Sequence, residues 1–268
     1  MKGAPQGADA GVSIVLVAVT EAERLHDALR QTTERLLRIL GGRVEQRDGY
    51  DLLVCRQLPF PVFNGVWVEA GIAPGALEQA LAEIMAEDLP AGVQVRVGRT
   101  PDVARQARRL GLVPREPVHG MVATPSELRS AGTSDVRVTR ARTRTDLSNA
   151  LAVVAAGFEA PRARFAPTYL PEVAELDGLR FYLALTEGAF VSTAIGYTLG
   201  DTVGIFNVAT PLRHRQHGYG TAVTRAAVAD GFDAGATLAW LQAPTPSRPL
   251  YARLGFRAVS TYMTYAPE

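Results

Sequence analysis

The chain has 268 residues, 47% of them apolar, so it can form one large or two ordinary globular domains with a real core. Its formal net charge of +1 gives no general field for attracting nucleic acid or an anionic membrane. The single cysteine, Cys55, excludes an internal disulfide and a thiolate metal site and suits a reducing compartment. We expect Cys55 to be a buried, inert thiol.

The first apolar segment, Gly11–Val19, is shorter than the ~20 residues that cross a bilayer. Only Lys2 precedes it as a basic residue, and acidic residues follow without an obvious cleavage site, so a secretory signal is disfavoured. We therefore expect a buried strand at Val12–Val19, a protein without a membrane partner, and a cytoplasmic location.

The first half of the chain alternates helical and strand patterns. After the first strand the expected elements are a helix at Glu21–Ile39, strands near Val44, at Leu52–Gln57 and at Val66–Glu69, a helix at Pro74–Ala86, a strand at Val93–Val97, a helix at Asp102–Leu110 and a strand at Val118–Val122. The polar segment Ala123–Asp135 has no apolar periodicity and is predicted to be a linker.

The second half repeats this alternation. The expected elements are a strand at Val136–Arg140, a helix at Thr145–Phe158, a proline-rich loop at Pro161–Pro171, strands at Arg180–Thr186, Phe190–Leu199 and Val203–Ala209, a helix at Tyr219–Phe232, a strand at Leu238–Gln242, a helix at Pro246–Leu254 and a strand at Ala258–Tyr265. Helices between key strands predict mixed α/β layers in both halves.

The ends of the two halves resemble each other. A shift of 144 positions places "ARRLGL", from Ala107, on "YARLGF", which starts one residue before Ala252. A repeat of this length indicates duplicated domains, at residues 1–122 and 136–268 with the linker between them. Ala107 falls opposite Tyr251, so the first half lacks any chemistry that Tyr251 performs.

The stretch "FNVATPLRHRQHGYGTAVTR" carries the clearest functional signal. Arg213 and Arg215 follow a strand, Gly218 and Gly220 come next, and a helix begins at once. Glycines allow close backbone approach, and a helix start offers unpaired N–H groups with partial positive charge, so a phosphate or pyrophosphate is the expected ligand. A solvated turn and a nucleic-acid patch are the alternatives, although the cations are few for the latter.

In their order and spacing, the strand "FNVAT", the Arg215-x-x-Gly218-x-Gly220 loop, the strand "LAWLQA" and the segment "PLYARLGF" resemble the Gcn5-related N-acetyltransferases (GNAT). The resemblance covers roughly Val136–Tyr265. For the first half it rests only on layout and on "ARRLGL". The resemblance therefore implies tandem GNAT-like domains, each a mixed, mostly antiparallel sheet flanked by helices, with a degenerate copy at residues 1–122.

The resemblance also implies roles for individual residues. The backbone of Val208, Ala209 and Thr210 would separate from the neighbouring strand and bind the pantetheine of acetyl-CoA. The loop formed by Arg215, Gln216, His217, Gly218, Tyr219, Gly220 and Thr221 would bind its pyrophosphate. Tyr251 would be the general acid that protonates the leaving thiolate.

No carboxylate is nominated as the general base, because Ala239, Trp240, Pro244 and Thr245 stand where many relatives carry a glutamate and an asparagine. Candidates by position alone are Asn207, Asp201 and Glu187, each also expected in a turn or on the surface.

His214 and His217 lie in a loop without a third ligand, so no metal is expected.

We expect a metal-independent enzyme that transfers acetyl from acetyl-CoA to a primary amine by direct attack. The N-terminal half would shape the acceptor cleft. A non-catalytic acyl-CoA sensor is the alternative. The loop Pro161–Pro171 suits a carboxylated metabolite, a peptide terminus or an aminoglycoside-like drug equally, and a homodimer is left open.

Overall fold

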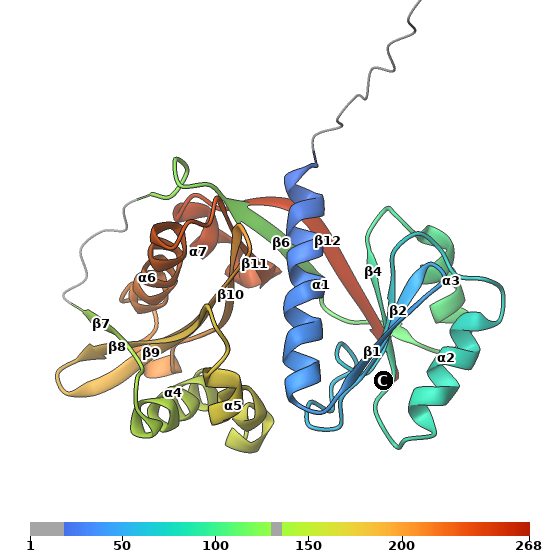
Figure 1. Cartoon of the computed structure of the whole chain (residues 1–268), viewed down its shortest axis with the longest axis horizontal. Coiled ribbons are helices and arrows are strands. Elements are labelled where there is room, and N and C mark those ends of the chain that lie inside the picture. Colours follow the sequence, from blue (N-terminus) through green and yellow to red (C-terminus); the bar gives the residue numbers. More distant parts are fainter. Residues whose placement is uncertain (1–18, 130–135) are drawn as a thin grey trace, which may run out of the picture.

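The computed structural model describes residues 19–129 and 136–268. Two α/β lobes lie side by side, and the long helix α1, Glu21–Ile39, runs between them (Figure 1). The strand predicted at Val12–Val19, apart from its last residue, and part of the predicted linker lie outside the described residues.

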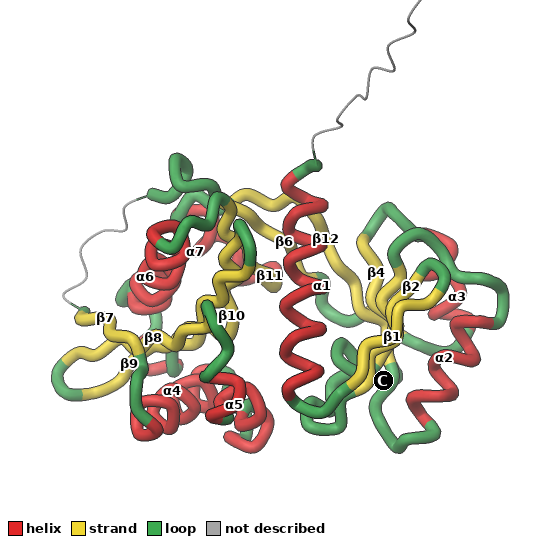
Figure 2. The backbone as a smooth tube through the Cα atoms, viewed as in Figure 1, coloured by secondary structure: helices red, strands yellow, loops and turns green. Residues whose placement is uncertain are grey.

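The N-terminal lobe contains a curved set of strands with two short helices on one side (Figure 2). After α1 the N-terminal half of the chain forms β1 (Arg43–Arg47), β2 (Tyr50–Val54), β3 (Gly65–Val68), α2 (Ala76–Met85), β4 (Gly92–Arg96), α3 (Pro101–Arg109), β5 (Val113–Pro114) and β6 (Val118–Ala123). The strand predicted at Leu52–Gln57 ends earlier than expected. The Cys55 N–H leaves the ladder and donates to Asn64 Oδ1 at 2.7 Å.

The C-terminal lobe contains the longer strands and the helices that flank them. The C-terminal half of the chain forms β7 (Arg137–Arg140), α4 (Arg144–Gly157), η1 (Arg162–Arg164), η2 (Ala166–Tyr169), α5 (Pro171–Ala174), β8 (Leu179–Thr186), β9 (Ala189–Leu199), β10 (Thr202–Ala209), η3 (Leu212–His214), α6 (Tyr219–Asp233), β11 (Leu238–Pro244), η4 (Thr245–Ser247), α7 (Arg248–Arg253) and β12 (Arg257–Ala266).

Local chemistry explains where the main helices begin. Thr20 caps α1 by accepting the N–H of Glu23. A capping box between Thr143 and Asp146 starts α4, and the N–H groups of residues 142 and 143 hold the pKa of the Asp146 carboxyl below its usual value. The segment predicted as the loop Pro161–Pro171 instead forms three short helical turns, because Pro167 and Pro171 sit in the first turns of η2 and α5, where proline favours a helix start.

Within the described residues, all strands join in one mixed sheet of order β1-β2-β3-β4-β12-β6-β11-β10-β9-β8-β7, with β5 paired to β12. The last strand of each half is exchanged. Strand β6 pairs with β11 of the C-terminal half, and β12 pairs with β4 of the N-terminal half. Strands β6 and β12 also pair with each other, so the sheet runs without a break from one lobe to the other.

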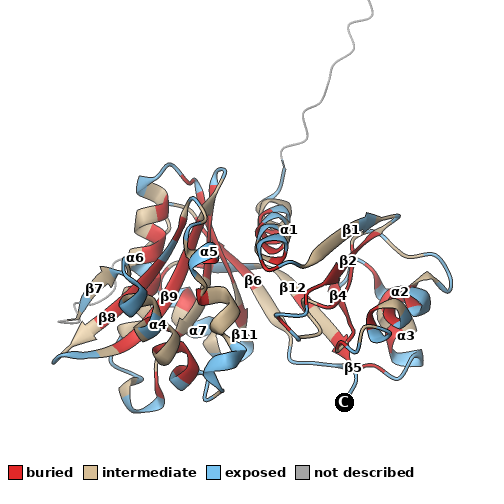
Figure 3. Cartoon of the chain, turned by 60° about the horizontal axis from the view of Figure 1, so that its bottom comes forward, coloured by how far each residue is buried: buried red, intermediate tan, exposed pale blue. Residues whose placement is uncertain are grey.

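The core is also shared between the halves. Buried residues follow the strands of the sheet (Figure 3). Leu25 and Leu29 of α1 belong to the same buried cluster as Tyr197 and Trp240 of the C-terminal lobe. His26 adds a polar connection, because its Nδ1 lies 3.3 Å from the Tyr262 hydroxyl on β12. Burial of each large side chain contributes about 1.5–3 kcal/mol, so the two lobes stabilise each other.

Candidate active site

The strands β10 and β11 run parallel and then part. Their register begins at Thr202 and Leu238 and ends with Ile205 opposite Leu241. A bulge follows in β10, where Asn207 has φ +48°, a left-handed conformation that asparagine tolerates better than most residues. The predicted separation of these strands is therefore confirmed, and it leaves one edge of residues 206–209 without a β11 partner.

The other edge of this segment is held firmly. Ala209 pairs with Thr193 on β9, and Ser192 Oγ donates to the Ala209 carbonyl at 3.0 Å. A Cβ on Gly157 would lie only 2.8 Å from the Ala209 Cβ, so a glycine is needed where α4 packs on β10. The end of β10, with Val208 and Ala209, and Thr210 after it are thus held by β9 and α4 on one side, while the other edge is open.

The loop before α6 presents a run of free amides. Gln216 has φ +66° and Gly218 has φ +79°, and these left-handed residues turn the chain into the helix. Among the described residues, no backbone or side-chain acceptor is hydrogen bonded to the N–H groups of residues 216–221, and the first helical amide to find one is that of Ala222. Such a cluster at a helix N-terminus is suited to bind a phosphate or pyrophosphate.

Arg215, by contrast, is engaged with the protein itself. Its Nε donates to the Thr210 carbonyl at 3.1 Å, and its Nη2 donates to the Gly157 carbonyl at 2.8 Å. The guanidinium therefore ties the loop to the end of β10 and to the C-terminus of α4. Arg213 donates to His214, and His217 lies 2.7 Å from the Arg215 carbonyl and stacks on Tyr219.

The N-terminal half has a loop of similar shape but different chemistry. Gly75 also precedes its helix with φ +79°. The loop nevertheless contains Pro74, which has no N–H, and the Ala76 N–H is satisfied by the Ala73 carbonyl at 3.1 Å. This loop offers fewer free amides than residues 216–221.

Tyr251 lies in α7, on the face of the sheet that carries α6. It is 8% exposed, contacts Phe256 edge to face, and belongs to the same cluster as Val208 and Leu250. Burial raises the pKa of the Tyr251 phenol to about 12, because the charged phenolate would be poorly solvated there. The side chain is therefore protonated at any physiological pH, so it can donate a hydrogen bond or a proton but cannot act as a base.

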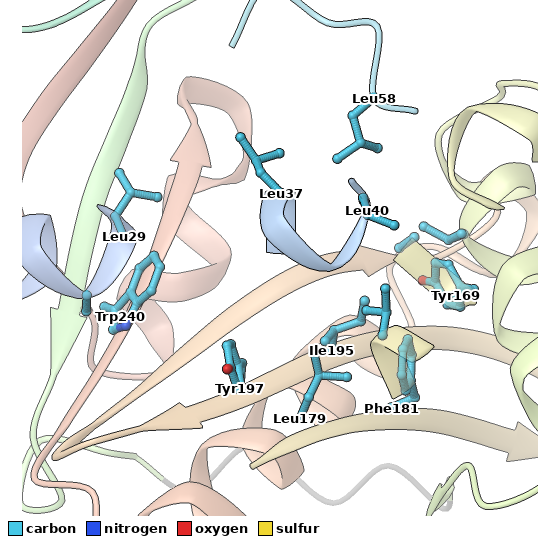
Figure 4. Close-up of a cluster of buried hydrophobic side chains, with 14 of the residues drawn as sticks. Leu29, Leu37, Leu40, Leu58, Tyr169, Leu179, Phe181, Ile195, Tyr197 and Trp240 are labelled. Carbon is cyan, nitrogen blue, oxygen red and sulfur yellow. The ribbon is translucent and has the colours of Figure 1, made fainter. Parts of the chain in front are cut away.

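A cavity of about 360 Å³ lies on the opposite face of the sheet, between the two lobes. Residues of α1, of the segment between β2 and β3, and of β8–β11 line it. In the buried apolar cluster beside it, Leu37 of α1, the C-cap residue Leu40 and Leu58 lie on the side opposite Leu179 and Ile195 (Figure 4). Phe206, Asn207 and Gln242 also line it, so the cavity reaches the point where β10 and β11 part.

The candidates for a general base lie in different places. Asn207 lines the cavity, but Glu187 with φ +48° and Gly188 with φ +76° form the β8–β9 turn. Asp201 is in the turn before β10, where it pairs with Arg24 at 2.5 Å. Within the described chain, no carboxylate lines the cavity.

His119 was isolated in the sequence but lies close to α7 in the structure. Its ring nitrogens lie 3.2 Å from the hydroxyls of Thr245 and Thr261. Burial, with the nearby charge of Arg248, lowers its pKa, so the imidazole is largely neutral at pH 7. It reaches the C-terminal lobe only because β6 is exchanged.

The profile of the acetyltransferase (GNAT) family matches residues 151–256. This segment contains the parting strands, the amide loop and Tyr251. Residues 151–256 form a GNAT acetyltransferase domain. No curated protein sequence matches the chain significantly.

Solved structures share the fold of this chain at low sequence identity. A GCN5-related N-acetyltransferase from Kribbella flavida is 21% identical, with a TM-score of 0.74 over 93% of this chain and 96% of its own. One from Sphaerobacter thermophilus is 16% identical, with a TM-score of 0.61 over 85% and 76%. A tandem GNAT protein from the clavulanic acid biosynthesis pathway is 16% identical, with a TM-score of 0.55 over 82% and 78%.

The GNAT family uses acetyl-CoA as its acetyl donor, so acetyl transfer is the general activity of this domain. The free amides of residues 216–221 are suited to its pyrophosphate, and the open edge of β10 to its amide-bearing arm. In residues 19–129 and 136–268, no group of three or more His, Cys, Asp or Glu side chains is placed to hold a metal ion. No helix in those ranges has the length and apolar character needed to cross a membrane.

Proposed function

We propose that the protein is an N-acetyltransferase that moves the acetyl group of acetyl-CoA directly to a primary amine. The observation that carries this proposal is the run of free N–H groups at residues 216–221 beside the open edge of β10. Together they provide hydrogen-bond donors for a pyrophosphate and a strand edge for the pantetheine amides.

In the proposed reaction, the neutral amine nitrogen attacks the thioester carbonyl carbon. A C–N bond forms, the C–S bond breaks, the nitrogen loses a proton and the thiolate gains one. Tyr251 supplies a hydrogen bond and then a proton to the sulfur. Its pKa exceeds that of a free thiol by about 3.5 units, roughly 5 kcal/mol, so hydrogen-bond donation is the stronger part of this role.

The N-terminal half is proposed to be a degenerate GNAT-like copy, with the division at residues 122 and 136. Its β3–α2–β4–α3–β6 order repeats β10–α6–β11–α7–β12, and each set begins with a parallel strand pair. Gly75 and Gly218 have the same φ of +79°. We propose that this half has a structural role at the acceptor site. The buried thiol of Cys55 is compatible with the proposed cytoplasmic location.

The test is an assay of thiol release with acetyl-CoA and a panel of amines, with the N-acetyl product identified by mass spectrometry. Acetyl-CoA binding is measured separately by calorimetry. Turnover together with amide formation supports the transferase. Tight acetyl-CoA binding without turnover on any amine supports an acyl-CoA sensor, which the absence of a carboxylate from the described cavity lining also favours.

A further inference from the structure

Resting on the proposed transferase function, we infer that the cavity between the lobes selects an acceptor with one amine, a large apolar side chain and a carbonyl oxygen beside the amine, as in an apolar α-amino amide. The two halves of the chain build this specificity site jointly.

The walls of the cavity favour an apolar occupant. Leu36 of α1 and Phe60 and Trp67 of the N-terminal half supply one side, and Ile195 and Phe206 supply the other. About 360 Å³ accommodates an aromatic side chain with room for a short polar end. Burial of an aromatic group here contributes about 1.5–3 kcal/mol to binding, before losses of freedom are counted.

Two polar groups in this apolar lining have no partner within the described chain. The Gln242 Nε2 atom is buried without a hydrogen bond, and so is the hydroxyl of Tyr197, a residue only 2% exposed. Each such group costs roughly 1–3 kcal/mol when it stays unsatisfied. Because Gln242 also lines the cavity, an acceptor whose carbonyl oxygen bonds to this amide once the side chain turns toward the cavity removes this cost.

The position of Gln242 places this carbonyl near the reacting amine. Gln242 comes directly after Leu241, the last residue of β11 that pairs with β10. Asn207 comes two residues after Ile205, the partner of Leu241 on β10. The two strands part here, and the open edge of β10 is where the proposed acetyl-CoA site begins. The carbonyl and the amine of the acceptor therefore lie at the same end of the molecule.

Charge disfavours acceptors with several ammonium groups. Among the described lining residues, Arg164 is the only charged one, and it lies over the Phe60 ring at 4.6 Å. A second ammonium group would enter an apolar cavity that offers a cation and no carboxylate. Lysine-like, polyamine and aminoglycoside acceptors are therefore poor ligands.

The same lack of a carboxylate favours an amine that is neutral without help. An α-amino group next to a carbonyl has a pKa of about 7.7–8.0, so roughly one molecule in ten is neutral at pH 7, against about one in 10³ for a lysine-like amine. An apolar α-amino amide thus needs no strong general base in the cavity.

The test compares phenylalaninamide with phenethylamine, which lacks the carbonyl, and with lysine, spermidine and kanamycin as multiply charged amines. We expect phenylalaninamide to have the highest kcat/KM. The variant Gln242→Leu should lower kcat/KM for phenylalaninamide about 10-fold and change that for phenethylamine little, since only the former supplies a carbonyl.

A second variant tests the part of α1 in the site. Leu36→Trp fills the cavity and should abolish turnover of both aromatic amines while acetyl-CoA binding is kept. Arg35→Trp, on the exposed side of the same helix, is the matched control and should leave both unchanged. Circular dichroism shows whether each variant is folded.

The outcomes separate this inference from the transferase proposal. Higher kcat/KM for lysine, spermidine or kanamycin would overturn the inference and leave the transferase standing. If no amine is acetylated, calorimetry with phenylalaninamide and bound acetyl-CoA decides. If the wild-type protein binds phenylalaninamide and Leu36→Trp does not, the cavity assignment is upheld and the transferase is contradicted. If the wild-type protein does not bind phenylalaninamide, both are contradicted.

Discussion

Asn207 on β10 and Gln242 on β11 line one cavity, although their strands stop pairing after Ile205 and Leu241. The bulge at Asn207 and the end of the β10–β11 ladder therefore lie together at one side of this cavity. On one face lie α6 with its amide loop and Tyr251, and on the other lies the cavity closed by α1. In the proposed reaction, the donor and the acceptor would approach the end of the β10–β11 ladder from opposite faces of the sheet.

The left-handed glycine before α6 should be required for acetyl-CoA binding. Gly218→Ala forces a side chain into φ +79°, at about 1–2 kcal/mol, and relaxation of that strain turns the amides of residues 216–221 away from the ligand. We expect a dissociation constant for acetyl-CoA at least about 10-fold higher, measured by calorimetry.

Gly75→Ala is the matched control, because Gly75 has the same φ at the start of α2 and an added Cβ meets no atom within 4 Å. It should lower thermal stability to a similar degree and leave acetyl-CoA binding intact. Equal loss of binding in both variants would contradict the assignment of the ligand to the C-terminal lobe.

Tyr251→Phe should lower kcat by about 10²-fold without changing acetyl-CoA affinity, since only the donor to the leaving sulfur is lost. Burial raises the phenol pKa to about 12, so the acid form persists as the pH rises. Wild-type kcat should therefore show no decline due to Tyr251 between pH 8 and about pH 10.

Tyr265→Phe, a buried tyrosine of the N-terminal core, is the control and should keep full activity. A kcat for Tyr251→Phe that equals the wild-type value would remove the tyrosine from the proposed reaction.

We expect Arg215 to support acetyl-CoA binding through the geometry of its hydrogen bonds and not through its charge. Arg215→Lys keeps the charge but loses the geometry that bridges the carbonyls of Gly157 and Thr210. We expect weaker acetyl-CoA binding, by about 10-fold, and a lower melting temperature. The control Arg213→Lys should change neither, and full binding by Arg215→Lys would show that a positive charge suffices.

The regular elements were largely predictable because their causes are local. The helix at Glu21–Ile39 was predicted from its sequence pattern with the bounds it has. The glycine loop was predicted from Gly218, Gly220 and the helix start that follows them, and the parting of β10 and β11 from the family resemblance. Those motifs lie on adjacent elements of one lobe.

The features that the sequence did not predict depend on contacts between residues far apart in the chain. Nothing in the sequence near Arg215 indicates that its guanidinium reaches the Gly157 carbonyl. The exchange of β6 and β12 is a choice of strand partner, which alternation of apolar residues does not specify. Gln242 was visible as a polar residue within "LAWLQA", but its place in a cavity that residues of α1 also line was not.

The strand exchange predicts which fragments fold. A fragment of residues 136–268 lacks β6, so the edge of β11 from Ala239 to Pro244 is unpaired and apolar strand surface is exposed. A fragment of residues 117–268 keeps β6 between β11 and β12. An open edge of this kind promotes aggregation. The longer fragment leaves open only the edge of β12 that pairs with β4, so we expect it to be more soluble than the shorter one and to bind acetyl-CoA. Both lack α1, so neither should bind phenylalaninamide. Size-exclusion chromatography and calorimetry on the two fragments measure these differences, and equal solubility would show that β6 is dispensable to the C-terminal lobe.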